Sequence, residues 1–220
     1  MQSHLMRGQS SSTLVRASRY SGGAFACCVG AALLLSSFAA DAQPLTLETP
    51  LRVDDYTSKY DDYFRHYSQR YFGPYVDWRW FKAQAIAESR LNPNARSFAG
   101  ACGVMQLLPQ TFEEIRLLNP NWDDINTPRW NIAAGIYYSR TLYQQWNGSL
   151  HGHDRFLLAL ASYNAGFQRV RNAYGITPRA RSFNDVRASL PAETRNYLDR
   201  IQYLMEPKEL ELTRVVARLD

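Results

Sequence analysis

The stretch AIAESRLNPNARSFAGACGVMQLLPQT, residues 85–111, carries a single carboxylate, Glu88, at the end of an apolar run. On a helix predicted over residues 77–90, Glu88 lies above Phe81 and Ala85, and no arginine shares that face. A carboxylate with apolar neighbours and no cationic partner has a raised pKa and stays protonated near neutral pH. Glu88 is therefore a candidate general acid for glycosidic cleavage. The alternative is a structural glutamate that bonds to loop amides at a helix end.

The segment after this helix predicts a loop or a small hairpin lip. It runs from Leu91 to Leu108 and contains Asn92-Pro93, Gly100 and Gly103, which break helices and favour turns. The sequence around it predicts a mainly α fold, because helical spacing and capping residues recur while alternating β patterns are few.

Four more helices are predicted from this punctuation. One begins at Pro109 and ends before Asn119-Pro120, and one runs from Thr127-Pro128 to Gly148. A third opens at Asp154 and closes at Gly166, and the last begins near Pro191. An aromatic stripe at helical spacing predicts a first helix that packs on the domain rather than stacking on sugar: Tyr56, Tyr60, Tyr63, Phe64, Tyr67 and Tyr71.

The N-terminus has the pattern of an export signal. Three arginines precede the apolar run AFACCVGAALLLSSFAA, which ends in a small-x-small cleavage site, so we expect cleavage after Ala42 and a periplasmic protein. A retained membrane anchor is the alternative. The predicted organisation is a signal peptide over 1–42, a linker over 43–54, one catalytic domain over 55–206 and a tail over 207–220. Beyond the signal, Cys102 is the one remaining cysteine, so no internal disulfide is expected.

Charge and composition limit the classes of molecule that the protein is expected to bind. Loss of residues 1–42 would lower the formal charge from +5 to +3, a small excess that suits an anionic polymer weakly. No Lys/Arg run interleaved with aromatics appears, so nucleic acid is not favoured. His151 and His153 lack a cluster of further ligands, and we expect no metal and no cofactor.

Three ordered blocks resemble the lytic transglycosylases of the soluble-lytic family. Ser162 to Gly166 resembles the A-Y-N-A-G segment of that family, with serine at the first position, and Pro191 to Tyr197 resembles its P-x-E-T-R-x-Y segment. The stretch from Tyr60 to Pro93 is further similar to the catalytic domain of the membrane-bound F-type members. The first block matches the family signature at these positions: Glu88-Ser89, Asn92-Pro93, Ala95, Ser97, Gly100-Ala101, Gly103, Met105-Gln106 and Pro109 through Thr111.

This resemblance implies a lysozyme-like fold and a peptidoglycan lytic transglycosylase. Glu88 corresponds to the family's single acid/base, which cleaves the β-1,4 bond between N-acetylmuramic acid and N-acetylglucosamine. The muramoyl C6 hydroxyl closes a 1,6-anhydro ring and no water is consumed. Conventional glycosidases need a second carboxylate, and the matching blocks contain none, so the resemblance assigns its role to the N-acetyl group of the substrate.

The resemblance also assigns roles around Glu88. It places the hydroxyls of Tyr197, as a catalytic residue, and of Ser97, as a binding residue, near the reacting centre; a core tyrosine and a turn serine are the alternatives. It places further substrate-binding residues along the glycan groove: Met105, Gln106, Leu108, Tyr163 and Asn164. A core role for Leu108 and a helix-capping role for Asn164 remain equally open, and Tyr163 is likewise balanced between a binding role and a structural one.

Two other functions stay open at this stage. One is a hydrolytic muramidase of the goose-lysozyme type, and the other is a scaffold that holds glycan without cutting it. We expect a monomer whose partner is the glycan strand of peptidoglycan, and the small size leaves room for a partner in an envelope or secretion machine.

Overall fold

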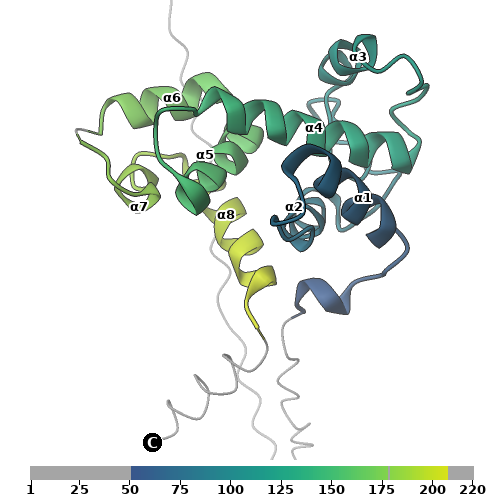
Figure 1. The fold of residues 1–220 in the computed structure, drawn as a ribbon, viewed down its shortest axis with the longest axis horizontal. Helices are drawn as coiled ribbons and strands as arrows, with labels where there is room; N and C mark the ends of the chain where they lie inside the picture. The colour runs from purple at the N-terminus through teal and green to yellow at the C-terminus, as the bar shows by residue number, and fades with distance from the viewer. Residues whose placement is uncertain (1–50, 178, 208–220) are drawn as a thin grey trace, which may run out of the picture. The chain divides into compact units, whose positions relative to one another are not determined.

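A computed structural model of the chain describes residues 51–177 and 179–207, which form a bundle of helices (Figure 1). A short 3-10 helix, η1 (Val53–Asp55), comes first. Eight α-helices follow in these residues: α1 (Asp61–Phe72), α2 (Arg79–Ser89), α3 (Pro109–Leu117), α4 (Pro128–Gln145), α5 (Gly152–Ala165), α6 (Phe167–Gly175), α7 (Phe183–Arg187) and α8 (Ala192–Met205). The expectation of a mainly α fold is confirmed.

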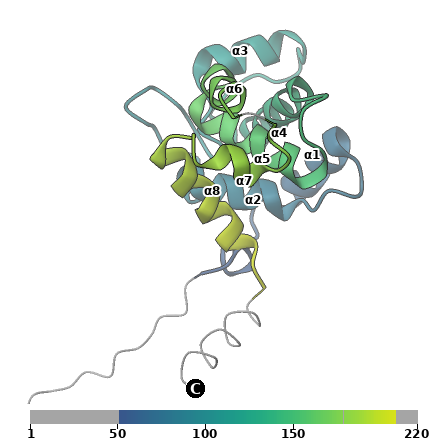
Figure 2. The ribbon, with the colours of Figure 1, turned by 90° about the vertical axis from the view of Figure 1, so that its left-hand side faces the viewer.

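The central helix is α4, which packs on α1 and α3 through one part of its surface and on α5 through another. Its sequence is rich in small and branched apolar residues, and Ile132, Ala134 and Ile136 are fully buried. Helix α2 packs between α1 and α8, so the last helix of the domain lies against the helix that carries Glu88 (Figures 1 and 2).

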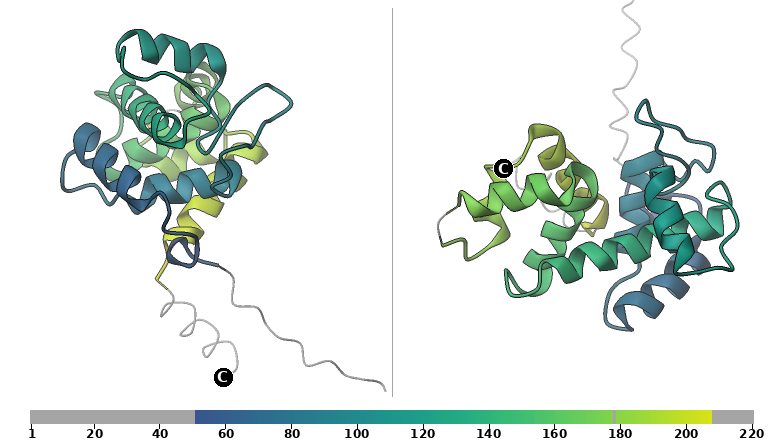
Figure 3. Two further views of the ribbon diagram at one scale, coloured as in Figure 1. Left: turned by 90° about the vertical axis from the view of Figure 1, so that its right-hand side faces the viewer. Right: turned by 90° about the horizontal axis from the view of Figure 1, so that it is seen from above.

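The connection between α2 and α3, residues 91–108, is the predicted lip. Two isolated antiparallel bridges, Arg96 with Cys102 and Cys102 with Leu107, fold it back on itself. The lip projects from the domain on the side opposite α1 (Figures 2 and 3).

Most of the predicted helices form close to the expected residues. Helix α3 begins at Pro109, and α5 ends before Gly166, whose φ of +85° is the backbone conformation that glycine adopts readily at a helix end. Helix α4 ends at Gln145, before the expected Gly148. Tyr56 and Tyr60 lie ahead of α1 rather than on it, because the helix begins only at Asp61.

Helices α6 and α7 were not predicted. Helix α6 buries only Val170 and Ala173 and begins directly after Gly166, so the turn signal that closes α5 also opens α6. Helix α7 has five residues, too few for a periodic pattern to stand out from the sequence.

Residues 51–60, here called the N-terminal strap, pack on the start of α2 and the end of α8. Arg52 is buried and donates from Nη1 to the carbonyl of Tyr203 at 2.6 Å. The strap therefore belongs to the folded domain from at least Arg52, within the predicted linker.

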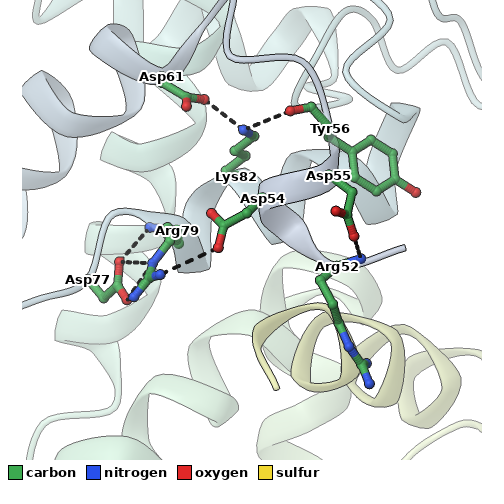
Figure 4. Close-up of polar contacts among 8 residues, drawn as sticks. All are labelled: Arg52, Asp54, Asp55, Tyr56, Asp61, Asp77, Arg79 and Lys82. Atoms are coloured by element: carbon green, nitrogen blue, oxygen red, sulfur yellow. Dashed lines mark hydrogen bonds and ion pairs between the residues drawn. The ribbon is translucent and has the colours of Figure 1, made fainter. Parts of the chain in front are cut away.

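Two basic residues of α2 hold the strap (Figure 4). Lys82, also buried, lies 2.8 Å from Asp61 and donates to the carbonyl of Tyr56. Arg79 pairs with Asp77 and reaches Asp54 at 3.6 Å. Of these pairs, that of Lys82 with Asp61 is largely buried, so removal of one partner would leave a charge unpaired in the interior.

Among the described residues, no helix has the length and apolar character needed to span a bilayer. The predicted signal segment, residues 1–42, lies outside the described residues, as does the predicted tail from residue 208 onward.

Candidate active site

Glu88 stands at the next-to-last position of α2, where α8 crosses it. The hydroxyl of Tyr197 on α8 donates to Glu88 Oε1 at 2.7 Å. The side chain of Glu88 is partly buried, and no ion pair reaches it within residues 51–177 and 179–207. The structure thus brings together the acid and the tyrosine that the sequence analysis singled out as catalytic.

Burial is the main influence on the acidity of Glu88. Loss of hydration raises the pKa of Glu88 from 4.5 to about 7, and the hydrogen bond from Tyr197 opposes this rise because it stabilises the carboxylate. The pKa of the Tyr197 hydroxyl is raised well above its ordinary value by burial first and by the charge of Glu88 second. Tyr197 therefore stays a donor at neutral pH, and Glu88 can both give and accept a proton.

Tyr163 and Gln84 complete the surroundings of the pair. Tyr163 on α5 donates its hydroxyl to the carbonyl of Met105 at 2.8 Å, and burial and the charge of Glu88 raise its pKa well above the ordinary value. Gln84 lies one helical turn before Glu88, is fully buried, and is close enough to the Tyr197 hydroxyl to lower its pKa. Its Oε1 accepts from Ser139 on α4 at 3.3 Å.

The side chains of Ser97 and Gln106 both form hydrogen bonds with the backbone of the lip. Ser97 is exposed, and its Oγ accepts the backbone N–H of Ala101 at 3.1 Å, so it shapes the turn. Gln106 has a φ of +48°, unusual for a residue with a side chain, and its amide donates to the carbonyls of Ala95 and Gly103. These bonds fix the strained backbone, and contacts of Ser97 and Gln106 with substrate stay predictions.

Met105 is completely buried, so its side chain in this structure packs the interior beneath the site instead of lining a surface. It lies against Gly135 of α4, where an added Cβ would approach its side chain to 2.7 Å. Its backbone serves the site more directly, since the carbonyl holds Tyr163 and the N–H donates to Asn131 Oδ1 at 2.7 Å.

Leu108 and Asn164 lie at helix ends. Leu108 precedes α3 and is 45% exposed, so it is available for contact with a ligand. Asn164 accepts from Thr194 Oγ1 at 2.9 Å, which ties α5 to α8. No hydrogen bond within the described part of the chain joins Ser97, Leu108 or Asn164 to Glu88.

The serine that departs from the family pattern is satisfied locally. Ser162 is fully buried, donates to the carbonyl of Leu158 at 2.8 Å, and accepts the indole N–H of Trp146 at 2.9 Å. The hydroxyl is therefore paired in both directions, and the change leaves no unmet polar group at this end of α5.

Asn131 and Gln84 are the residues that sequence reasoning missed. Asn131, buried on α4, binds the lip through the N–H of Met105 and through the carbonyl of Cys102 at 3.0 Å. The available signal was a lone amide in an otherwise apolar helix face, as in the run Ile132 to Ile136 that follows Asn131 and in AQAIA around Gln84.

Comparison with known proteins finds relatives among the lytic murein transglycosylases. The chain is 32% identical over 158 residues to the membrane-bound lytic murein transglycosylase F of Shewanella sediminis, which covers 69% of this chain and 30% of that protein. It therefore spans under a third of the length of the curated relatives it matches.

Solved structures match over the same region. The 70-kDa soluble lytic transglycosylase of Escherichia coli superimposes with a TM-score of 0.57 at 27% identity, covering 69% of this chain and 24% of that one. An inactive mutant of the lytic transglycosylase Slt from Pseudomonas aeruginosa gives a TM-score of 0.57 at 25% identity, covering 68% and 24%. The predicted lysozyme-like fold and the predicted family resemblance are both confirmed.

The family described as the transglycosylase SLT domain matches residues 62–185, which include all but the first residue of α1, then α2, the lip and α5 with Tyr163. Since this match covers more than half of the chain, the protein belongs to the transglycosylase SLT domain family.

Proposed function

We propose that this protein is a peptidoglycan lytic transglycosylase in which Glu88 is the single acid/base. The observation that carries the proposal is the state of Glu88: its pKa is about 7, and its carboxyl bonds to a tyrosine that stays protonated. A carboxyl group with a pKa near the working pH is suited to donate a proton in one step and to accept one in the next. Membership of the SLT domain family supports the same reaction.

In the first step, protonated Glu88 gives its proton to the glycosidic oxygen between N-acetylmuramic acid and N-acetylglucosamine. The bond from C1 to that oxygen breaks, and the N-acetylglucosamine hydroxyl leaves. The acetamido oxygen of the muramoyl unit meets the positive charge at C1. In the second step, the Glu88 carboxylate takes the proton of the C6 hydroxyl while O6 bonds to C1, so the anhydro ring closes and Glu88 returns to its protonated state.

The surroundings of Glu88 fit a mechanism with one carboxylate. Burial and the Tyr197 hydroxyl are the influences on the pKa of Glu88, and no other carboxylate of the described residues contributes to it. A conventional retaining or inverting glycosidase uses two carboxyl groups at about 5 to 9 Å from each other. Tyr197 supports the step in which Glu88 is charged, because its O–H donates to the carboxylate form.

The experiment that tests this function is mass spectrometry of muropeptides released from purified sacculi. The wild-type protein is compared with Glu88→Gln and with Asp62→Asn, which removes an exposed carboxylate on α1. We expect wild type and Asp62→Asn to release products lighter by one water than hydrolytic products, and Glu88→Gln to release none. Products with a reducing end would establish a hydrolytic muramidase, and binding to sacculi without release would establish a scaffold; either result would overturn the proposal.

A further inference from the structure

A polar cavity of about 350 Å³ lies on the domain away from the Glu88 site. Helix α1 contributes Tyr67 and Arg70, the connection from α3 to α4 contributes Asn119 and Asn121, and the first turn of α4 contributes Arg129 and Trp130. Helix α1 and the lip lie on opposite sides of the domain (Figures 2 and 3), and none of the predicted site residues lines this cavity. We call it the α1–α4 pocket.

The charged side chains that line the α1–α4 pocket are all basic. Arg70 and Arg129 both line it and are exposed, whereas no aspartate or glutamate does. Neither arginine forms an ion pair with any residue in 51–177 or 179–207, whereas Arg65 on α1, Arg79 on α2 and Arg116 on α3 each pair with a nearby acid. Two guanidinium groups without an acid beside them favour an anionic ligand, and their fork of N–H donors matches a carboxylate.

One of these arginines is held in place before any ligand arrives. Arg129 Nε donates to the Tyr67 hydroxyl at 3.1 Å, and its guanidinium carbon lies 4.4 Å from the centre of the Trp130 ring. Trp130 in turn stacks on the buried Trp122, with ring centres 6.0 Å from each other and planes at 17°. Because Nε is used in this bond, the two outer nitrogens of Arg129 remain to bind a ligand, and little further ordering is needed.

Amide groups extend the pocket beside the two arginines. Asn119 is oriented by its own bond, since Nδ2 donates to the carbonyl of Ile115 at 2.9 Å at the end of α3. Asn121 is exposed at the rim. Primary amides bind peptide groups and acetamido groups through paired donor and acceptor atoms. The pocket therefore offers carboxylate recognition next to amide recognition, which is the chemistry of a short acidic peptide.

We propose that the α1–α4 pocket binds the carboxylate-bearing peptide stems of peptidoglycan and so holds the wall on the side of the domain away from Glu88. This inference rests on the proposed function, because peptide stems are carried by the glycan that Glu88 would cut. The pocket contributes affinity for peptide-bearing wall and leaves the cleavage chemistry unchanged.

The test is a titration of the Glu88→Gln protein, which cannot consume the ligand, with a purified disaccharide tetrapeptide. The indole N–H signals of Trp122 and Trp130 are followed by two-dimensional NMR, and an uncharged chito-oligosaccharide without peptide serves as the second ligand. We expect the muropeptide to shift both indole signals and the peptide-free oligosaccharide to leave them in place. The double variant Arg70→Gln with Arg129→Gln should bind the muropeptide more weakly, with a dissociation constant at least about 10-fold higher.

A matched variant controls for net charge. Arg171→Gln with Arg200→Gln removes two exposed arginines outside the pocket and should leave muropeptide binding within 2-fold of the parent. Unmoved indole signals, equal weakening by both double variants, or equal binding of an unrelated acidic peptide such as oligoglutamate would overturn the inference. Equal binding of the free tetrapeptide would support it and assign recognition to the peptide alone.

The two proposals fail in distinguishable ways. If sacculi yield anhydro products but the muropeptide leaves the indole signals unmoved, the pocket inference is wrong and the proposed function stands. If the muropeptide binds the pocket but the wild-type protein releases nothing from sacculi, the proposed function is wrong and the pocket remains a wall-binding site. Thermal unfolding distinguishes a binding role of the arginines from a structural one. If they act in binding, both double variants should unfold within about 2 °C of the parent protein.

Discussion

Two opposing influences set the acidity of Glu88. Burial disfavours its charge and the hydroxyl of Tyr197 favours it, and the net result is a pKa of about 7. Both influences depend on the crossing of α2 and α8, because Tyr197 reaches Glu88 from α8. The acid is therefore tuned by a neighbour 109 residues further along the chain.

Tyr197→Phe should change the pH profile as well as the rate. Loss of the O–H removes the influence that lowers the pKa of Glu88, so this pKa rises. Because cleavage needs protonated Glu88, activity falls as pH rises through its pKa, and in the variant this fall should occur at a higher pH. The charged state of Glu88 also loses a donor worth about 1.5 kcal/mol, so kcat/KM should drop by about 10-fold.

The measurement is kcat/KM on soluble glycan strands between pH 5 and pH 9. The pH dependence of kcat/KM reports the pKa values of groups in the free protein. Tyr174→Phe, which alters a tyrosine that packs on Trp146 of the core, is the control and should keep the wild-type profile. A Tyr197→Phe profile with an unchanged alkaline limb would show that the hydroxyl does not tune Glu88.

Glu88→Gln should gain stability at alkaline pH. The pKa of Glu88 is about 7 in the folded protein against an ordinary value of 4.5, so the folded state binds this proton more tightly than the unfolded state does. The stability that this provides is fully present below pH 4.5 and is lost as pH rises from 4.5 through 7. Glutamine does not ionise, so the variant escapes the loss, which is at most about 3 kcal/mol for a shift of this size.

Urea unfolding of both proteins at pH 4.5 and pH 8 measures this effect. The free energy of unfolding of the variant relative to wild type should be higher at pH 8 than at pH 4.5. An identical difference at the two pH values would mean that Glu88 ionises in the folded state as it does in water.

At the scale of elements, the lip is held by side chains that no local pattern identifies. Loop residues with turn signals, Asn92-Pro93, Gly100 and Gly103, made the lip predictable from sequence. The part played by Asn131 was not predictable, because its partners are backbone groups of the lip 26 and 29 residues away. The boundaries of α3 and α5, which have proline or glycine at an end, were placed to within two residues. Helix α6 was missed because Gly166 marks the end of α5 and the start of α6 at once, and α7 was missed because it has only five residues.

Gly103→Ala should destabilise the domain far more than Gly100→Ala. Both glycines have φ near +80°, so each alanine costs about 1 kcal/mol of backbone strain. At Gly103 an added Cβ would also lie 2.5 Å from the Asn131 amide, while at Gly100 it would meet nothing within 4 Å. We expect a loss of about 3 kcal/mol for Gly103→Ala and about 1 kcal/mol for Gly100→Ala, measured by urea unfolding. Equal losses would show that Asn131 does not clamp the lip.

At the scale of the whole domain, the N-terminal strap joins α1, α2 and the end of α8. Only residues 51–54 of the strap fall in the linker predicted over 43–54, a polar and proline-containing segment, whereas residues 55–60 fall in the predicted domain. The strap packs on the domain through long-range contacts of Arg52 with the carbonyl of Tyr203 and of Lys82 with the carbonyl of Tyr56, which depend on the finished fold. The candidate acid Glu88 could be identified from its block of sequence, but its proximity to Tyr197 could be suggested only by resemblance, since the two residues come from helices distant in sequence.

Lys82→Met should lower stability by about 3 kcal/mol, because it leaves the carboxylate of Asp61 partly buried without its partner. Adding Asp61→Asn should restore part of this loss. Arg65→Met, which breaks the exposed pair of Arg65 with Asp62, should cost no more than about 0.5 kcal/mol. Thermal and urea unfolding of the four proteins measures these differences, and equal losses for Lys82→Met and Arg65→Met would show that the buried pair of Lys82 with Asp61 does not stabilise the packing of α1 on α2.

The proposed chemistry depends above all on Glu88 being half protonated near neutral pH. The most direct measurement is a carbon-13 NMR titration of the glutamate side-chain carboxyl groups in the folded protein, with the Glu88 signal assigned by its absence from Glu88→Gln. The prediction is a midpoint at about pH 7 for Glu88. A midpoint near 4.5, the ordinary value for glutamate, would contradict it and leave the protein without a neutral carboxyl group to begin the reaction.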